Sequence, residues 1–351
     1  MIIGVDPHKG SHTATAVDAV TNTSVSSVRI DATIGGYRQL LRWARQFGER
    51  RWAVENARGL GCHLAQWLVA QDEVVLDAST AATARVRELS RGGRRKNDVI
   101  DAAAAASVAA LQGDASVVAA EDITVVFALL EERRANLAAQ RVRSVNQLHA
   151  LLRDLIPGGA PTALKANTAA TLLRKIRPKT PPEATRKALA WDLVREIRSI
   201  DTRLGSVTTQ MTEALQDYST RLLEVDGIGP VLAVRLIGRC GRPSRFPNAD
   251  AFANYAGVAP IEVSSGERAV HRLSRGGDRK LNSALHLVAV TQVRMHNSAG
   301  RRYYDHKISE GKTHKAAMRC LKRKIASHVW RLMLADERHR SSTTRAQPKA
   351  A

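Results

Sequence analysis

Four acidic side chains lie where strand ends and one helix face could turn them toward a common point. Asp6 and Glu55 each end a short apolar run, and Asp98 and Asp101 are three residues apart, so a helix places them on one face. Carboxylates that meet repel one another unless a cation neutralises them, and Mg²⁺ prefers oxygen ligands. A two-ion site can activate a nucleophile and stabilise a leaving oxygen on phosphorus. Each acid alone fits a turn, a cap or a solvated face, but the combination predicts catalytic ligands for two Mg²⁺ ions.

The elements that must position these acids are those of an α/β domain. β-Branched residues, partial alternation and turn-forming interruptions predict strands over 2–6, 12–19 and 25–31. Helical periodicity and short apolar runs then predict a helix over 35–47, a strand over 52–55, a helix over 60–70, a strand over 74–76, and helices over 81–89 and 98–111. This order describes an RNase H/RuvC-like domain, in which the first and fourth strands are neighbours. Asp6 is then expected beside Glu55.

The rest of the chain is predicted to be mostly helical. Long helical patterns cover 121–156 and 183–220 and could pair as an antiparallel or an intermolecular coiled coil. The Pro- and Gly-containing stretch between them predicts a linker or a small irregular insertion. We therefore expect four parts. These are a RuvC-like catalytic domain at 1–115, a helical coiled-coil region at 116–221, a C-terminal domain at 222–335 and a disordered tail at 336–351.

Charge is concentrated in the last third of the chain. The 351 residues carry a net charge of +21, of which residues 221–351 contribute +15. This distribution favours a nucleic-acid partner, with a basic surface kept for solubility as the alternative. No stretch approaches the roughly 18 apolar residues that span a bilayer. Three scattered cysteines fit neither a disulfide framework nor a zinc site, so we expect a protein of the reducing cytoplasm.

Two segments of the last third are suited to phosphate. Gly227-Ile228-Gly229 between two predicted helices is typical of a helix–hairpin–helix turn, whose glycines let backbone N–H groups approach a phosphate. An ordinary helix–helix turn is the alternative. A basic, glycine-hinged segment follows downstream, and a basic loop precedes Asp98, where a lysine could contact a scissile phosphate or be one more loop charge. The predicted nucleic-acid contacts are Lys96, Gly227, Gly229, Arg272, Arg275, Arg279 and Lys280.

Ser264-Ser265-Gly266 is, from its spacing alone, normally just a turn. Further on, residues 313–333 predict a basic amphipathic helix. Its apolar face is best explained as core, and its basic face as solvated or on DNA.

Several motifs together resemble the DEDD-type insertion-sequence transposases, relatives of the pilin-gene DNA invertases. The resemblance covers about residues 1–335. Gly4 to Lys9 is similar to the opening of the family's RuvC-like domain, and Lys96 to Ala102 to its K-x-D-x-x-D-A signature. Leu223 to Pro260 is similar to the start of its C-terminal transposase domain. One departure is Asn56-Ala57-Arg58-Gly59 after Glu55, where many relatives have a small residue and then Thr-Gly.

The resemblance implies more than the residues alone do. In such enzymes a serine just after the A-G-[LV]-x-P segment acts with the acidic tetrad, which makes Ser265 the candidate nucleophile and Ser264 the neighbour that could be confused with it. It also implies homo-oligomers, as dimers or tetramers. A structured bridge RNA is expected to pair with donor and target DNA, so that base pairing chooses the sequence.

The sequence therefore predicts a Mg²⁺-dependent, RNA-guided site-specific DNA recombinase that moves an insertion sequence. The main alternative is a RuvC-like nuclease or Holliday-junction resolvase, in which metal-activated water is the nucleophile. A second alternative is a non-enzymatic RNA- or DNA-binding protein with a degenerate core. The presence of all four carboxylates argues against it.

Overall fold

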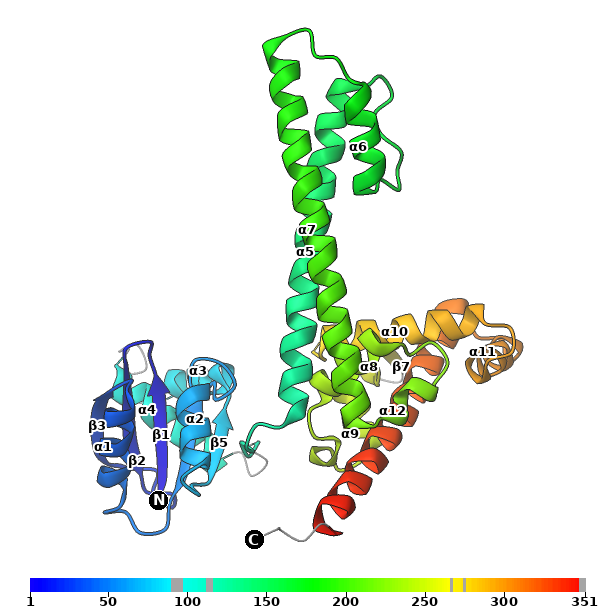
Figure 1. Ribbon diagram of the computed structural model, residues 1–351. Coiled ribbons are helices and arrows are strands. Elements are labelled where there is room, and N and C mark those ends of the chain that lie inside the picture. The colour runs from blue at the N-terminus through cyan, green and yellow to red at the C-terminus, as the bar shows by residue number, and fades with distance from the viewer. Residues whose placement is uncertain (90–96, 112–115, 266–267, 274–275, 347–351) are drawn as a thin grey trace. The chain divides into compact units, whose positions relative to one another are not determined.

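The computed structural model describes residues 1–89, 97–111, 116–265, 268–273 and 276–346, with the backbone alone for 261–273 and 343–346 (Figure 1). The chain divides into two compact units, Met1–Glu121 and Asp122–Ala351. Each unit has its own hydrophobic core. Lys96 and Arg275, two of the predicted nucleic-acid contacts, lie outside the described residues.

The first unit is built on a mixed five-stranded sheet with the order β3-β2-β1-β4-β5. β1, β2 and β3 pair antiparallel, whereas β4 runs parallel to both β1 and β5. This is the RNase H-like arrangement, and the predicted adjacency of the first and fourth strands is confirmed. The elements are β1 (Ile2–Pro7), β2 (Ser11–Val17), β3 (Ser24–Asp31), α1 (Ile34–Ala44), β4 (Arg51–Glu55), α2 (Cys62–Val69), β5 (Val75–Ala78), α3 (Thr80–Leu89) and α4 (Asp98–Leu111).

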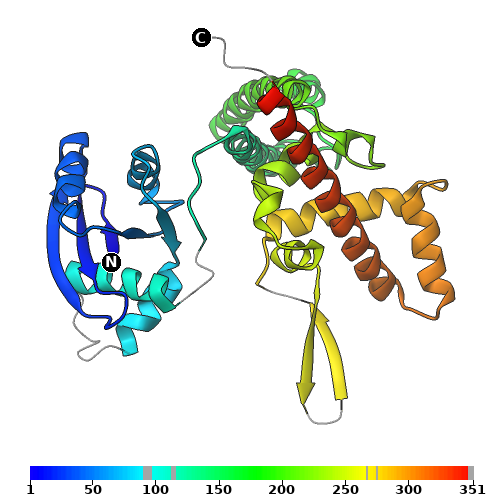
Figure 2. The same ribbon diagram turned by 90° about the horizontal axis from the view of Figure 1, so that it is seen from below.

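The two faces of the sheet are covered differently, with α1 and α2 on one side and α4 on the other (Figure 2). Because side chains alternate along a strand, Ile3 and Val5 of β1 enter the core beneath α1 and α2. Ile2 belongs to the smaller apolar cluster beneath α4, and Asp6 has the same parity. The period of two therefore directs Asp6 toward the α4 face.

Close packing of α4 on β1 depends on Gly4. A Cβ atom at Gly4 would lie 1.8 Å from the carbonyl oxygen of Ala102 and 2.7 Å from the amide nitrogen of Ala106. α4 consists largely of alanine, so its backbone can approach the sheet without side chains in between. This close approach brings the first turn of α4, with its two aspartates, over the end of β1.

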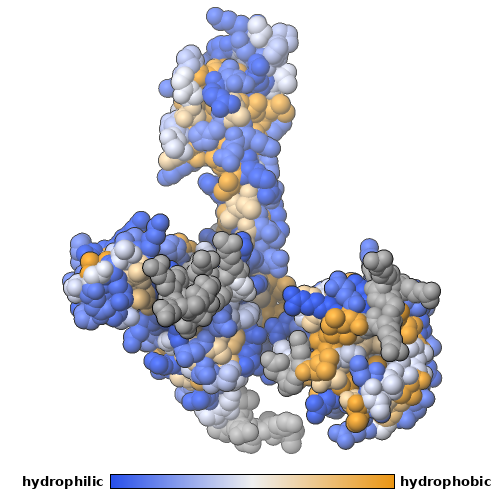
Figure 3. Space-filling model, turned by 180° about the vertical axis from the view of Figure 1, so that it is seen from behind, coloured by the Kyte–Doolittle hydropathy of each residue, from blue (hydrophilic) through white to orange (hydrophobic). Residues whose placement is uncertain are grey.

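The second unit begins with a long helical hairpin. α5 (Ile123–Leu155) and α7 (Pro181–Tyr218) run antiparallel, since Arg134 bonds Thr208 while Asp154, further along α5, pairs with Arg186, further back along α7. Of the two pairings predicted from the sequence, the structure has the antiparallel one within the chain. Most of the visible surface is hydrophilic, with apolar residues along this hairpin (Figure 3). Val142 and Leu189 are 57% and 49% exposed.

The connection between the hairpin helices differs from the predicted irregular insertion. It contains α6 (Ala166–Lys175), whose Ala169, Ala170 and Leu173 are buried in a separate core at this end of the hairpin. The prolines lie on either side of α6 and do not interrupt it. The uninterrupted stretch is therefore long enough for a helix of about three turns.

The C-terminal helices surround the largest core of the chain. The Gly-Ile-Gly turn connects a 3₁₀-helix to α8, and Gly227 has a φ of +83°, a conformation that glycine adopts at no steric cost. The elements are η1 (Arg221–Glu224), α8 (Pro230–Cys240), η2 (Pro243–Arg245), α9 (Ala249–Tyr255), β6 (Pro260–Ser265), β7 (Arg268–Leu273), α10 (Arg279–Arg294), α11 (Ala299–Ser309) and α12 (His314–Ala346).

Two features of this part were not predicted. β6 and β7 form an antiparallel hairpin that projects from the helices (Figure 2). The expected disorder after Ala335 is also corrected, because α12 continues to Ala346. Asp336 is buried there, and it accepts hydrogen bonds from the Thr220 hydroxyl (3.0 Å) and the Arg221 guanidinium (2.9 Å). These contacts hold the polar end of the helix.

Within the described residues, no helix combines the length and apolar character needed to cross a bilayer.

The Gly4 contact gives a first prediction. Gly4→Ala should displace α4 from β1 and lower the free energy of unfolding by about 3 kcal/mol or more. The added methyl group would collide with backbone atoms of α4, which cannot move aside as a flexible side chain can. Hydrogen–deuterium exchange of the β1 and α4 amides should become faster. Gly10→Ala is the matched control, since nothing lies within 4 Å of its Cβ position. Equal exchange in both variants would contradict this account of the packing.

Candidate functional site

Asp6 and Glu55 stand at the ends of neighbouring parallel strands. The register pairs Val5 with Val54, so the next residue of each strand is acidic. Asp6 is buried, with 8% of its surface exposed, and Glu55 is half-buried. Both continue the face of the sheet that α4 covers.

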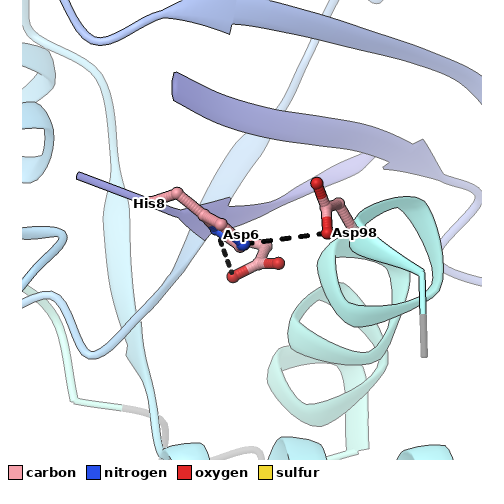
Figure 4. A group of neighbouring side chains, drawn as sticks. All are labelled: Asp6, His8 and Asp98. Atoms are coloured by element: carbon pink, nitrogen blue, oxygen red, sulfur yellow. Dashed lines mark ion pairs between the residues drawn. The ribbon is translucent and has the colours of Figure 1, made fainter. Parts of the chain in front are cut away.

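α4 brings the second pair of acids to the same place. Asn97 caps the helix, and its side chain accepts a hydrogen bond from the backbone N–H of Val99 at 3.0 Å. Asp101 is buried and Asp98 is half-buried. His8, directly after β1, lies between the two elements, with Nδ1 3.5 Å from Asp6 Oδ1 and Nε2 3.7 Å from Asp98 Oδ1 (Figure 4).

The charges of this cluster act strongly on Asp6. Burial raises the pKa of Asp6 to about 6, His8 opposes the rise, and the negative charges of the other three acids add to it. Because each of the other three acids raises the pKa of Asp6, all four carboxylates must lie close together. The four acids chosen from the sequence are Asp6, Glu55, Asp98 and Asp101, and the fold gathers them at one end of the sheet.

A cleft of about 320 Å³ opens beside these acids. It is lined by Asp6, Pro7, His8, Glu55, Asn56, Leu60, Thr80, Thr83, Ala84, Arg87 and Asp101. The site is therefore accessible from outside although two of its carboxylates are buried. A ligand in the cleft would contact acidic oxygens from β1, β4 and α4.

Two residues of α3 complete the cleft, and the sequence analysis missed both. The Thr83 hydroxyl donates to Glu55 Oε1 at 2.9 Å, and the Arg87 guanidinium donates to Asp101 Oδ1 at 2.7 Å. They are four residues apart, so they lie on one face of a helix that was itself predicted. That spacing of a hydroxyl and a guanidinium was the available signal. It was too common a pattern to stand out.

Asp77 of β5 shapes the turn that follows Glu55. Asn56 has a φ of +50°, and the next amide, of Ala57, donates to Asp77 Oδ1 at 2.9 Å. Arg58 Nε lies 3.5 Å from the other Asp77 oxygen. The departure from the family pattern after Glu55 is thus a defined turn held by Asp77.

The residues of the cluster suit a divalent cation. Asp6, His8 and Asp98 offer ligand atoms that all lie within 4.8 Å of one another. Asp6 Oδ2 is buried and has no hydrogen-bond partner among the described residues. A buried carboxylate oxygen without a partner is costly in a folded protein unless a cation or water reaches it. Oxygen donors that dominate the set favour Mg²⁺ or Mn²⁺ over softer metals.

Apart from Lys96, the residues predicted to contact nucleic acid belong to the second unit. Gly227 packs against Thr291 of α10, while Gly229 is exposed and caps α8, so the N-terminus of α8 is open to an anion. Arg279 is exposed. Lys280 lies 3.4 Å from the buried Glu131, which the Arg235 guanidinium also contacts at 2.9 Å. Lys280 therefore already balances part of a buried charge.

Ser265 ends strand β6 and faces Arg268 across the hairpin in the backbone register. Arg272 lies in β7, opposite Ile261. The side chains of these residues lie outside the described part of the chain. Ser265 belongs to the second unit of the chain, whereas the four carboxylates belong to the first unit.

The electrostatics of Asp6 predict an inverse pH effect in metal-free protein. Because the folded pKa of about 6 lies above the ordinary aspartate value of 3.8, ionised Asp6 destabilises the folded state above pH 6. Asp6→Asn should therefore stabilise the protein at about pH 7 by up to about 3 kcal/mol. The gain should shrink as pH falls through 6 and vanish below the unfolded pKa.

Thermal unfolding with a chelator, and then with Mg²⁺, measures this effect. Mg²⁺ should raise the melting temperature of the unmodified chain more than that of Asp6→Asn, because the ion neutralises the repulsion. Asp18→Asn is the control, since backbone N–H groups of Thr21 and Val20 lower the Asp18 pKa and give the opposite sign. A variant no more stable than the parent at neutral pH would contradict the repulsion.

Comparisons with known proteins agree with this geometry. Residues 3–157 match the model of the DEDD transposases of IS110 type, and residues 219–305 match the transposase family IS116/IS110/IS902. The 44.8 kDa protein of insertion element IS116 from Streptomyces clavuligerus is 28% identical over 387 aligned residues, covering 96% of this chain and 95% of that protein. The 42 kDa protein of insertion element IS900 from Mycobacterium paratuberculosis is 25% identical, covering 85% of this chain and 86% of that protein.

A third relative covers less. The 43.6 kDa protein of insertion element IS110 from Streptomyces coelicolor is 33% identical over 149 residues, or 39% of this chain and 36% of that protein. Membership of a transposase family implies that DNA is cleaved and that strands are transferred. With both family domains in order on one polypeptide, this chain belongs to the IS110/IS116/IS900 transposases, with a DEDD domain at its N-terminal side and the second family domain at its C-terminal side.

Proposed function

We propose that this chain is a Mg²⁺-dependent, RNA-guided site-specific DNA recombinase that moves an insertion sequence, with Ser265 as its nucleophile. The observation that carries the proposal is the gathering of four carboxylates from β1, β4 and α4 at one end of the sheet, where Asp6, Glu55 and Asp101 line an open cleft. DNA is a phosphate polymer, and acidic oxygens can approach it only through cations. The cluster therefore supports phosphodiester chemistry.

The four carboxylates take the role of metal ligands. Asp6 and Glu55 would hold ions from the strand ends, and Asp98 and Asp101 from the helix above them. Bound there, two divalent cations would stabilise the attacking and leaving oxygens of an in-line displacement. Thr83 orients Glu55 through its hydroxyl, and Arg87 holds Asp101. Arg87 also lines the cleft, where its guanidinium suits a phosphate oxygen.

The covalent step exchanges one phosphodiester for another. Ser265 Oγ forms a bond to phosphorus and loses its proton, while the bond from phosphorus to the leaving strand breaks and that strand gains a hydroxyl. Because one phosphate ester replaces another, the bond energy is kept in the adduct and a second hydroxyl can reverse the step. Rejoining then needs no external energy source, as strand exchange requires.

The assembly of this site requires two units of the chain. The carboxylates lie in unit Met1–Glu121 and Ser265 in unit Asp122–Ala351. We propose that the active site forms only when they meet, within one chain or between subunits of a dimer or tetramer, so that a solitary protein does not nick DNA. The exposed Val142 and Leu189 on the α5/α7 hairpin suit a contact between copies.

The proposed division of labour follows the expected boundaries. Residues 1–115 carry the metal ligands, 116–221 the helical hairpin, and 222–335 the serine hairpin and most of the basic charge. A bridge RNA would select donor and target by base pairing, leaving the protein to contact backbone and shape. The resemblance to the family supports this part of the proposal, together with the net charge of +15 over residues 221–351.

Substitution of Ser265 separates this function from that of a RuvC-like resolvase. Ser265→Ala should abolish a protein–DNA adduct, seen as a shifted band on a denaturing gel with labelled element-end DNA, while DNA binding remains. Ser264→Ala is the matched control, and we expect it to keep the adduct. Asp98→Ala should abolish both cleavage and adduct, with a loss in rate on the order of a thousandfold or more.

The opposite result has a definite meaning. If Ser265→Ala still cuts DNA in Mg²⁺ and no adduct forms with the unmodified chain, water is the nucleophile and the protein acts as a resolvase. An adduct that moves to Ser264 would instead show that the nucleophile was assigned to the wrong neighbour.

A further inference from the structure

A groove of about 570 Å³ opens between the segment before β6 and the helices α11 and α12. Its lining combines apolar side chains with cations and contains no carboxylate among the described residues. The lining residues are Val258, Ala259, Pro260, Tyr303, Lys312, Ala316, Arg319, Cys320, Lys322, Arg323, Lys324 and Ser327.

Lys322 is the unusual member of this lining. It is buried, with 8% of its surface exposed, and burial lowers its pKa. Across the described residues it has no carboxylate partner, and its one recorded bond is from Nζ to Asn282 Oδ1 at 2.7 Å. An ammonium has three N–H donors, so two remain for another acceptor. A buried cation without an anion is costly, which makes an external anion its natural partner.

The position of Lys322 is fixed by Asn282. The Asn282 amide donates to the carbonyl oxygens of Gly257 at 2.8 Å and Ala256 at 3.2 Å, so its oxygen is the one acceptor left for the lysine. The turn that leads to β6 is therefore tied to the ammonium through one side chain. This is a built cation position, in contrast to a flexible surface lysine.

The neighbouring cations fall into two groups. Arg323 pairs with Asp250, and Lys312 lies 3.3 Å from Glu310, so both are already balanced. Arg319 and Lys324 are exposed, and no carboxylate partner is recorded for either within the described part of the chain. With Lys322, they leave three positive charges directed at one groove.

We propose that this groove binds the backbone of a single DNA strand, with a phosphate on Lys322 and sugar and base atoms on the apolar lining beside Tyr303. The proposal rests on the proposed function, and it adds where the strand is held. The groove has the volume of a small-ligand site, so it admits a nucleotide or two of one strand and excludes a duplex. Aromatic side chains beside a basic groove are typical of single-strand binding.

Its chemistry favours DNA over RNA. A 2′-hydroxyl is both donor and acceptor, and it needs polar partners when it is buried. Val258, Ala259, Pro260 and Ala316 form the apolar part of the lining and offer no polar side chain. Deoxyribose can lie against these apolar side chains without leaving a polar group unpaired.

The groove lies at the base of the hairpin that carries Ser265. Pro260 lines the groove and begins β6, and Ser265 ends it. At about 3.3 Å per residue, the strand separates the two by roughly 17 Å at most. That length corresponds to about five nucleotides at the duplex rise of 3.4 Å per nucleotide, and to fewer in an extended single strand. Lys322 would therefore hold a flanking phosphate and position the strand, while the scissile phosphate lies further along.

Salt-dependent binding of the full-length chain tests this site. Affinity for a fluorescent single-stranded DNA of mixed sequence is measured against salt concentration, with a chelator so that no cleavage occurs. Lys322→Met keeps the length of the side chain and removes its charge. It should weaken binding about tenfold and reduce the slope of log affinity against log salt by about 0.7, the value of one phosphate contact on a single strand.

Arg331→Met is the matched control on the same helix. Arg331 is exposed and nine residues from Lys322, which at 3.6 residues per turn places it on the opposite side of α12. Its substitution should leave the slope unchanged. Should Lys322→Met fail to fold by circular dichroism, the exposed groove residue Arg319 replaces it as Arg319→Met, with the same expected change in slope.

Each outcome decides the assignment. A lower slope for the groove variants and an unchanged slope for Arg331→Met supports the site. Unchanged slopes in Lys322→Met and Arg319→Met, or a loss confined to single-stranded RNA of the same sequence, would overturn it. Failure of the serine mechanism can be distinguished from failure of this site. If Ser265 is not the nucleophile, Ser265→Ala still cleaves DNA, and the salt dependence of binding measured here does not change.

Discussion

Repulsion between like charges is the interaction on which the rest of the first unit depends. Asp6, Glu55, Asp98 and Asp101 are held together by backbone packing, with Gly4 and the alanines of α4 leaving no side chain between helix and sheet. The cost appears in the pKa of Asp6, which burial raises first and the other three acids raise further, and in its Oδ2, which has no hydrogen-bond partner among the described residues. A structure that maintains such a cost at one end of its sheet is prepared for a cation. The transposase family of the chain gives that cation its chemical context.

Partial compensation around the carboxylates has a physical meaning as well. The His8 ring and the Arg87 guanidinium lie beside three of the acids, so the carboxylates are partly compensated within the chain. Neither replaces a hard cation, because each contacts a carboxylate from one side and leaves other lone pairs free. The negative charge that remains leaves an electrostatic reason for a metal ion to bind.

In the described part of the second unit, buried charges are paired with opposite charges of the chain, with Lys322 as an exception. Buried Glu131 pairs with Arg235 and Lys280, and buried Asp336 pairs with Arg221, so these two carboxylates are matched within the chain. Lys322 is buried, and among the described residues the Asn282 amide is its one partner. Because Glu131 and Asp336 are paired in the same core, a buried lysine without a described anion is informative.

Local patterns in the sequence determined the α/β order of the first unit, the acidic tetrad and the long helices. Strand alternation and helical periodicity are short-range signals, and right-handed chain topology then leaves few sheets to choose from. The helix α6, the β6/β7 hairpin and the continuation of α12 past Ala335 depended on long-range contacts, such as Asp336 with Arg221, that no window of sequence contains. Arg87 and Lys322 gained their significance only from what surrounds them. The sequence determines the residue type and its charge, but the burial of a side chain and its hydrogen-bond or ion-pair partners are decided by the folded chain.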